Sequence, residues 1–149
     1  MALAAQPPGC FSNGKTTSAH CADNAISNIC RLRHGIVGDA HAGDWHRQIS
    51  LLAQESIDTM RAACPIPLEP GVFAENINTQ GIDLKNLPLG TRLRIGQTQV
   101  EVTQIGKTCH NDCAIKKAVG KCVMPTEGIF AVVVTEGIIR PGDEIEVLP

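Results

Sequence analysis

Three of the seven cysteines lie within residues 102–131, and a histidine and several lysines surround them. The cysteines of this stretch are Cys109, Cys113 and Cys122. A thiolate is the reactive form of cysteine, and neighbouring cations lower the free energy needed to form it. The stretch therefore predicts a site that forms a thiolate and uses it.

Cys109 has Lys107 and His110 beside it in the sequence, and it follows a predicted strand that ends near residue 105. A side chain at the exit of a strand can be both held in place and accessible. We therefore predict that Cys109 is the reactive thiol, with Lys107 and His110 as its catalytic neighbours. The alternative is a buried, inert thiol, because free cysteine is among the most buried residue types.

Cys113 and Cys122 have more than one interpretation. Cys113 lies four residues after Cys109, so a helical turn would place both thiols on one face. Cys113 could then resolve a persulfide as a disulfide or bind a metal. Cys122 could approach this pair or have a structural role. The sequence assigns no role to the other cysteines, Cys10, Cys21, Cys30 and Cys64.

The composition argues against several classes of protein. The 149 residues suffice for one domain with a buried core. A net charge of -2 and an aromatic content of 3% argue against a nucleic-acid-binding surface. No apolar run approaches the roughly 18 residues of a transmembrane helix, and the N-terminus lacks the basic segment of a signal peptide. Seven cysteines do not pair evenly into disulfides. We therefore expect a cytoplasmic protein with reduced thiols that binds neither nucleic acid nor membrane.

Apolar and polar residues alternate in several stretches of the second half of the chain. Alternation predicts strands with one buried face, and repeated turn-strand units suit a barrel. Residues 87–105 and 129–148 should therefore be antiparallel strands of one barrel. Shorter strands are expected at 26–32 and 71–78, and helices at 53–63 and 113–119. The fold class is mainly β with short helices, as a small β-barrel.

The N-terminal part shows neither a helical nor a strand period. Residues 1–25 are polar and rich in turn formers, so they are predicted to be irregular. We divide the chain into an irregular segment, 1–30, with at most a degenerate first strand, and a barrel domain, 31–149.

Glycines at positions 35, 38 and 43 mark a loop that carries two aspartates and two histidines. These residues are Asp39, His41, Asp44 and His46. Their side chains could ligate a metal. They lack a regular spacing, however, so we favour hydrogen bonds that fix the loop. Arg47 follows directly, and its planar guanidinium suits a phosphate group.

Glu75 and Asn76 form a polar pair within the predicted strand 71–78. A buried polar pair needs hydrogen-bond partners. The pair either braces the glycine loop or contacts a ligand, and the sequence does not decide between these roles.

Several separated motifs resemble the MOSC domain, the C-terminal domain of molybdenum-cofactor sulfurases that also occurs as stand-alone bacterial proteins. The matching runs, in the family's order, are GDAHAG, DWHRQISLL, PGVFAENI, TQGIDL, NLPLGTRLRIG, TQVEVTQ, GKTCHNDCAI and MPTEGIFAVV. The likeness covers roughly residues 35–149. It implies a β-barrel with short helices, and it places the family's sulfur-carrying cysteine, which follows a V-T-Q strand, at Cys109.

The resemblance also implies a link to molybdenum cofactor, a pterin that bears a phosphate and a dithiolene. We predict that this anionic group contacts His41, Arg47, Glu75, Asn76 and Cys109. No pyridoxal phosphate is expected on this chain.

Three functions from different classes remain open. In the first, Cys109 accepts sulfane sulfur from a pyridoxal-phosphate-dependent cysteine desulfurase and delivers it to molybdenum cofactor or a metal–sulfur centre. Its partners would be that desulfurase and proteins of molybdenum-cofactor biosynthesis or molybdoenzymes. In the second, Cys109 ligates molybdenum in an oxidoreductase that reduces N-hydroxylated compounds. In the third, a structural zinc is held by Cys109, His110, Cys113 and Cys122.

Overall fold

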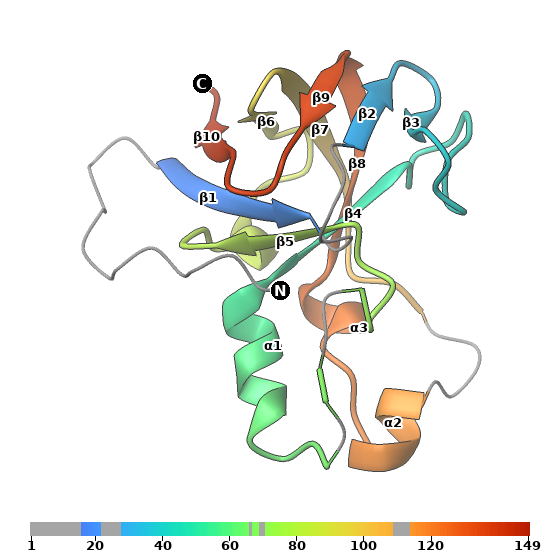
Figure 1. Ribbon diagram of the computed structural model, residues 1–149, viewed down its shortest axis with the longest axis vertical. Coiled ribbons are helices and arrows are strands. Elements are labelled where there is room, and N and C mark those ends of the chain that lie inside the picture. The colour runs from blue at the N-terminus through green and yellow to red at the C-terminus, as the bar shows by residue number, and fades with distance from the viewer. Residues whose placement is uncertain (1–15, 22–27, 66, 69–70, 109–113) are drawn as a thin grey trace.

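Seven β-strands close into a barrel in the computed structural model, which describes residues 16–21, 28–65, 67–68, 71–108 and 114–149 (Figure 1). Around the barrel the strands follow the order β1-β10-β6-β7-β8-β4-β5, and β5 pairs with β1 to complete the circle. The strands are β1 (Thr16–Cys21), β4 (Ile49–Ala53), β5 (Ile77–Gln80), β6 (Arg92–Ile95), β7 (Thr98–Ile105), β8 (Ile129–Thr135) and β10 (Glu144–Val147). The predicted mainly β fold with a small barrel is confirmed.

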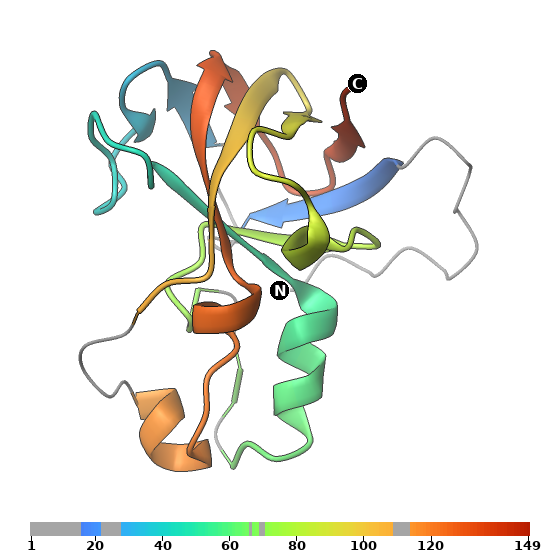
Figure 2. The same cartoon turned by 180° about the vertical axis from the view of Figure 1, so that it is seen from behind.

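A second, smaller sheet has the order β3-β2-β9 and lies at the end of the molecule opposite the described helices (Figures 1 and 2). Its strands are β2 (Asn28–Arg31), β3 (Gly35–Ile36) and β9 (Gly137–Ile139). The helices are α1 (Gln54–Arg61), the 3-10 turn η1 (Leu84–Asn86), α2 (Ala114–Val119) and α3 (Met124–Glu127). No helix among the described residues is long and apolar enough to cross a membrane.

The alternation in the sequence has a direct counterpart in β6 and β7. Along β6, exposed arginines alternate with the buried Leu93 and Ile95. β6 pairs with β7 through a two-residue turn, in which Gly96 has a φ of 56°, as tight hairpin turns require. The prediction of antiparallel barrel strands in 87–105 and 129–148 is confirmed for β6, β7, β8 and β10, whereas β9 joins the small sheet.

β4 and β5 are the one parallel pair of this barrel, and all other neighbours in it run antiparallel. Parallel neighbours need a crossover connection, and α1 begins directly after β4 to provide it. The predicted helix at 53–63 is confirmed within its bounds. α1 buries Ser56, Ile57 and Met60.

Two apolar clusters result. The barrel interior is filled by residues of the closed sheet, among them Ile49, Leu51, Ile77, Leu93 and Ile129. The second core lies outside the barrel; it consists of Leu52, Ile57, Met60, Phe73, Val123, Met124 and Phe130. β4 serves both clusters, because Leu51 faces the first and Leu52 the second. The second core thus joins the barrel to α1 and α3.

The N-terminal segment differs from its prediction. Residues 1–25 were expected to be irregular, but Thr16–Cys21 forms β1, which pairs with β5 on one side and β10 on the other. The sequence TTSAHC has no apolar alternation, so the strand depends on its two neighbours and not on its own pattern. Cys10 lies outside the described residues.

The strand predicted at 71–78 is also shorter than expected, because only Ile77–Gln80 belongs to β5. Residues 71–74 form a turn closed by the hydrogen bond from Ala74 N to Gly71 O, 2.9 Å. Ala74 has a φ of 61°, in the left-handed region that β-strands do not use. This turn brings Glu75 and Asn76 into positions that a regular strand would not give them.

Candidate functional site

Arg47, two residues before β4, contacts two aromatic rings. Its guanidinium carbon is 4.6 Å from the centroid of the Trp45 ring and 5.6 Å from that of Phe130 on β8. Both distances are within the range of cation–π contacts. Arg47 Nε is buried and has no hydrogen-bond partner among the described residues. A buried donor normally has an acceptor, so the Arg47 head group can take an additional, preferably anionic, acceptor.

The end of β7 fastens the segment that carries Arg47. His46 Nε2 lies 2.8 Å from Gln104 Oε1. The Thr103 hydroxyl lies within hydrogen-bonding distance of the carbonyl oxygens of His46 and Phe130. Gln104 Nε2 donates to Gly106 O at 2.8 Å. The arginine is therefore held against the strand from which the chain continues toward Cys109.

The segment after β7 is attached to α3. Gly106 N donates to Gly128 O at 2.6 Å, and Lys107 N donates to Pro125 O at 3.1 Å. Gly106 has a φ of 69°, and a Cβ at this position would overlap Pro125 O. Only glycine fits here without displacing α3. The chain thus leaves the barrel in a fixed place two residues before Cys109.

The predicted catalytic group is only partly placed. Lys107 is half-buried. Cys109, His110 and Cys113 lie outside the described residues, so the role of Cys109 as the reactive thiol and its contact with a cofactor held by Arg47 stay predictions. Cys122 is half-buried and packs against the second core.

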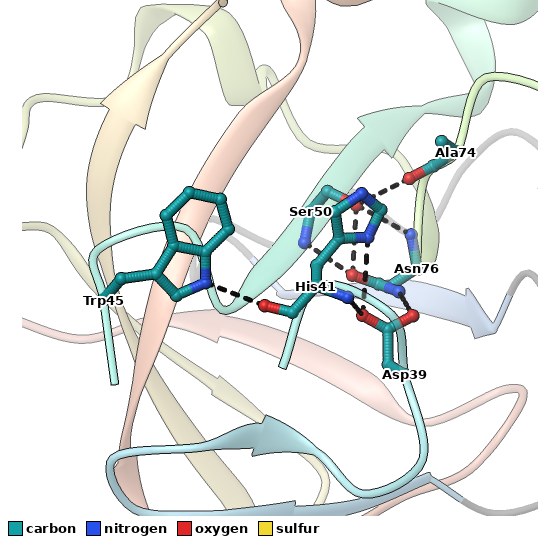
Figure 3. Close-up of polar contacts among 6 residues, drawn as sticks. All are labelled: Asp39, His41, Trp45, Ser50, Ala74 and Asn76. Carbon is teal, nitrogen blue, oxygen red and sulfur yellow. Dashed lines mark hydrogen bonds and ion pairs between the residues drawn. The ribbon is translucent and has the colours of Figure 1, made fainter. Parts of the chain in front are cut away.

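A polar network ties the glycine loop to the barrel (Figure 3). Asn76 Nδ2 donates to Asp39 Oδ1, and His41 N donates to Asp39 Oδ2, both at 2.8 Å. Asn76 Oδ1 accepts from Ser50 N at 2.9 Å, on β4. At the other end of the network, Trp45 Nε1 donates to His41 O at 2.7 Å. The bonds run from β4 through Asn76, Asp39 and His41 to Trp45, whose ring supports Arg47.

The imidazole ring of His41 lies near Asp39 but makes no hydrogen bond to it through Nδ1. Its Nδ1 lies 3.4 Å from Asp39 Oδ2, yet it makes no hydrogen bond within the described part of the chain. This contact is an ion pair only when the imidazole is protonated, so it does not fix the ring in its neutral form. Asp44 instead pairs with Arg33 at 2.8 Å.

These contacts support the interpretation that the loop residues fix the loop. Within the described ranges, no group of three or more His, Cys, Asp and Glu side chains could hold a metal ion. Asp39 and Asp44 use their carboxylates within the chain.

Glu75 is buried and closes the turn before β5. Its Oε1 accepts from Gly71 N at 2.7 Å and its Oε2 from Phe73 N at 3.0 Å. Burial raises the pKa of Glu75 above its ordinary value of 4.5, although the hydrogen bonds from Gly71, Phe73 and Asn78 act in the opposite direction. Glu75 thereby holds Phe73 in the second core. These bonds support a bracing role, while cofactor contact by Glu75 and Asn76 stays a prediction.

Four residues of this site were not predicted from the sequence: Trp45, Thr103, Gln104 and Phe130. Trp45 did carry a signal, because it is the single tryptophan of the chain and lies two residues before Arg47. Thr103, Gln104 and Phe130 carried none, since they reach the loop only through the pairing of β7 with β8.

Comparison with known proteins identifies the family of this chain. A model of the MOSC domain matches residues 38–146. The chain belongs to the MOSC family. The match includes the glycine loop, Arg47, the end of β7 and α3, and it confirms the family named from the sequence motifs. No curated protein matches the sequence.

Solved structures share the fold of this MOSC domain. The YuaD protein from Bacillus subtilis superposes with a TM-score of 0.70 at 21% identity, covering 89% of this chain and 95% of that one. YiiM from Escherichia coli gives a TM-score of 0.67 at 15% identity, covering 90% of this chain and 70% of that one. YiiM from Geobacillus stearothermophilus gives 0.59 at 16% identity, covering 88% and 75%. At these identities the likeness is one of fold.

Proposed function

We propose that this MOSC domain carries sulfane sulfur on Cys109 and delivers it to molybdenum cofactor. The family is related to molybdenum-cofactor sulfurases. The observation that carries the proposal is Arg47, whose buried Nε has no partner in the described chain and whose head group contacts Trp45 and Phe130. An oriented, partly desolvated guanidinium is a suitable holder for a phosphate.

The described residues fit an anionic pterin at this place. Arg47 would hold the phosphate, and the side chain of Lys107 would add a second positive charge near it. Cys109 follows Lys107 by two residues, a length of chain that spans at most about 7 Å, and the backbone of Lys107 is held by Pro125 O. When bound, molybdenum cofactor supplies the metal centre that receives the sulfur. The contacts with Trp45 and Phe130 would orient the guanidinium toward the anion.

The sulfur transfer to this chain is a thiol exchange that needs no oxidant. The Cys109 thiolate attacks the terminal sulfur of a persulfide on a pyridoxal-phosphate-dependent cysteine desulfurase. A new S–S bond forms at Cys109, the S–S bond of the donor breaks, and the donor cysteine leaves as a thiolate. A positive charge from Lys107 or His110 would favour the attacking thiolate at neutral pH.

Loading with a desulfurase and cysteine tests this proposal. We expect one additional sulfur atom on the wild-type chain, measured by mass spectrometry, and none on Cys109→Ser. Cys64→Ser is the matched control, because Cys64 is half-buried and lies after α1. Loading that survives in Cys109→Ser contradicts the carrier role, and loss in Cys113→Ser alone would move the role to that cysteine.

The second candidate is a molybdenum oxidoreductase that reduces N-hydroxylated compounds, with Cys109 as a metal ligand. Arg47 favours it to the same degree, because the same cofactor must be held. Metal analysis of protein purified from a molybdenum-replete host separates the two functions. Stoichiometric molybdenum that disappears in Cys109→Ser indicates the oxidoreductase, and sulfane sulfur without molybdenum indicates the carrier. The same analysis would detect zinc, whose predicted ligands lie mostly outside the described residues.

A further inference from the structure

A cavity of about 330 Å³ lies between α1, the turn that follows β5, and α3. None of its lining residues belongs to the site around Arg47. Its apolar lining includes Ala53 and Leu84, which are buried, and Ile82, which is half-buried. Cavities of a few hundred Å³ with an apolar lining and a few polar groups are typical of sites for small molecules.

The polar groups of this cavity carry a net negative charge. Glu55, Asp83 and Glu127 contribute three carboxylates, and Lys85 contributes one ammonium group. Three negative charges and one positive charge leave a net charge of -2. A cleft lined by an excess of one sign concentrates ions of the opposite sign.

The carboxylates keep capacity for further donors. Glu127 Oε1 pairs with Lys85 Nζ at 2.9 Å, and Glu55 Oε1 accepts from Gly81 N at 2.7 Å. A carboxylate has two oxygens and about four acceptor positions. An ammonium group, with three N–H donors, can therefore bind at Glu127 without displacing Lys85 completely.

We propose that this cavity binds a small organic cation that has a primary ammonium group on a short apolar chain. The ammonium group pairs with Glu127 in the negative field of Glu55 and Asp83, whose Oδ2 accepts from Asn86 Nδ2 at 2.7 Å, and the apolar chain covers Ala53, Ile82 and Leu84. An anion of the same size would meet the same three carboxylates and would have to compete with Glu127 for Lys85. The site is separate from the proposed sulfur chemistry, so binding is expected in the chain as purified.

Three probes of equal length test the proposal: pentylammonium, pentan-1-ol and pentanoate. Binding is followed by NMR on ¹⁵N-labelled protein at about pH 7, where an alkylammonium is fully charged. Pentylammonium should shift the amide signals of Gly81, Ile82 and Lys85, and it should bind at least about fivefold more tightly than the alcohol. Equal or tighter binding of pentanoate overturns the proposal, as does the absence of localised shifts with pentylammonium.

Substitutions of the two residues of the ion pair, Lys85 and Glu127, should have opposite effects on the affinity for pentylammonium. Glu127→Gln should weaken pentylammonium binding by about threefold to fivefold, and Lys85→Gln should strengthen it, because each changes the charge of the cavity by one unit. Glu101→Gln is the matched control, since Glu101 pairs with Arg92 on the barrel surface. Weakening by Lys85→Gln, or equal weakening by Glu101→Gln, contradicts a cation site in this cavity.

Discussion

Arg47 is the residue on which the proposed function most depends. Arginine can stack on aromatic rings and still direct its N–H groups at an anion, and lysine cannot do both. The Trp45 ring holds the guanidinium at 4.6 Å and is itself held by the carbonyl of His41. Residues far apart in the sequence thus set the orientation of one side chain.

Arg47→Lys should lower the affinity for inorganic phosphate by about tenfold, because the charge remains but the planar stack and the two-pronged hydrogen bonding are lost. Trp45 is the single tryptophan, so its fluorescence reports events at this ring directly. Arg33→Lys is the control, because Arg33 is an exposed arginine paired with Asp44 of the glycine loop. Equal phosphate affinity in wild type and Arg47→Lys would show that Arg47 is not the anion site.

Glu75 should leave a signature in the pH dependence of stability. Its pKa in the folded protein is raised by burial above the ordinary 4.5, so the folded state binds more protons than the unfolded state between these two values. The contribution of Glu75 is therefore greatest at low pH and is lost as the pH rises through the raised pKa. In Glu75→Gln this loss is absent.

Urea denaturation at a series of pH values measures this effect. The free energy of unfolding of the wild type minus that of Glu75→Gln should fall as the pH rises above 4.5. Glu101→Gln, on the exposed surface, serves as the reference for an ordinary carboxyl substitution. If the free energy of unfolding of the wild type minus that of Glu75→Gln instead rises with pH, then hydrogen bonding and not burial dominates the pKa of Glu75.

At the scale of elements, α3 and the residue after it hold the chain where it leaves β7, two residues before the predicted reactive thiol. Lys107 N donates to Pro125 O within this short helix, Gly106 N donates to the carbonyl of Gly128 at its C-cap, and Met124 anchors the helix in the second core. This contact could not be predicted from the sequence, because the two segments are about 20 residues apart and neither has a regular period. Hydrophobic periodicity predicts helices and strands, but it does not predict a contact between two irregular segments.

Gly106→Ala should destabilise the fold by about 2–4 kcal/mol, since it combines a left-handed backbone with overlap at Pro125 O. It should also slow sulfur loading at Cys109, because the segment would leave α3. Gly120→Ala provides a matched control: its φ is 84°, but a Cβ there would meet no atom within 4 Å. That variant should cost only about 1–2 kcal/mol. Equal losses in both variants, measured by denaturation, would show that the contact with α3 is unimportant.

The elements that were predicted well from the sequence are those in which apolar and polar residues alternate regularly. β6 and β7 alternate because one face of each fills the barrel, and that requirement is visible residue by residue. The candidate site could be predicted in part for a different reason: residue types suited to chemistry, such as Arg47 and Cys109, are recognisable without any period. Its supports were not visible: Asn76 and Asp39 are 37 residues apart and meet only because β4 and β5 are neighbours.

At the scale of the whole molecule, closure of the barrel depends on β1. This strand pairs with β5 from Ser18 to Cys21 and with β10 from Thr16 to Ser18. Without it, both neighbours become edges with unpaired backbone groups, and such edges promote association between molecules. The backbone pairing of β1 with both neighbours is therefore the contribution that can be tested.

Removal of residues 1–21 should therefore lower the free energy of unfolding by on the order of 3 kcal/mol or more, because several backbone hydrogen bonds of about 0.5–1.5 kcal/mol each are lost. It should also increase light scattering, as the edges of β5 and β10 pair with other molecules. Removal of residues 1–15 is the control, because it ends just before β1 and leaves every described pairing in place. Urea denaturation gives the stability of each form. If the two truncated chains are equally stable and equally monomeric, β1 is not needed to close the barrel, and the seven-stranded ring is in effect an open sheet of six.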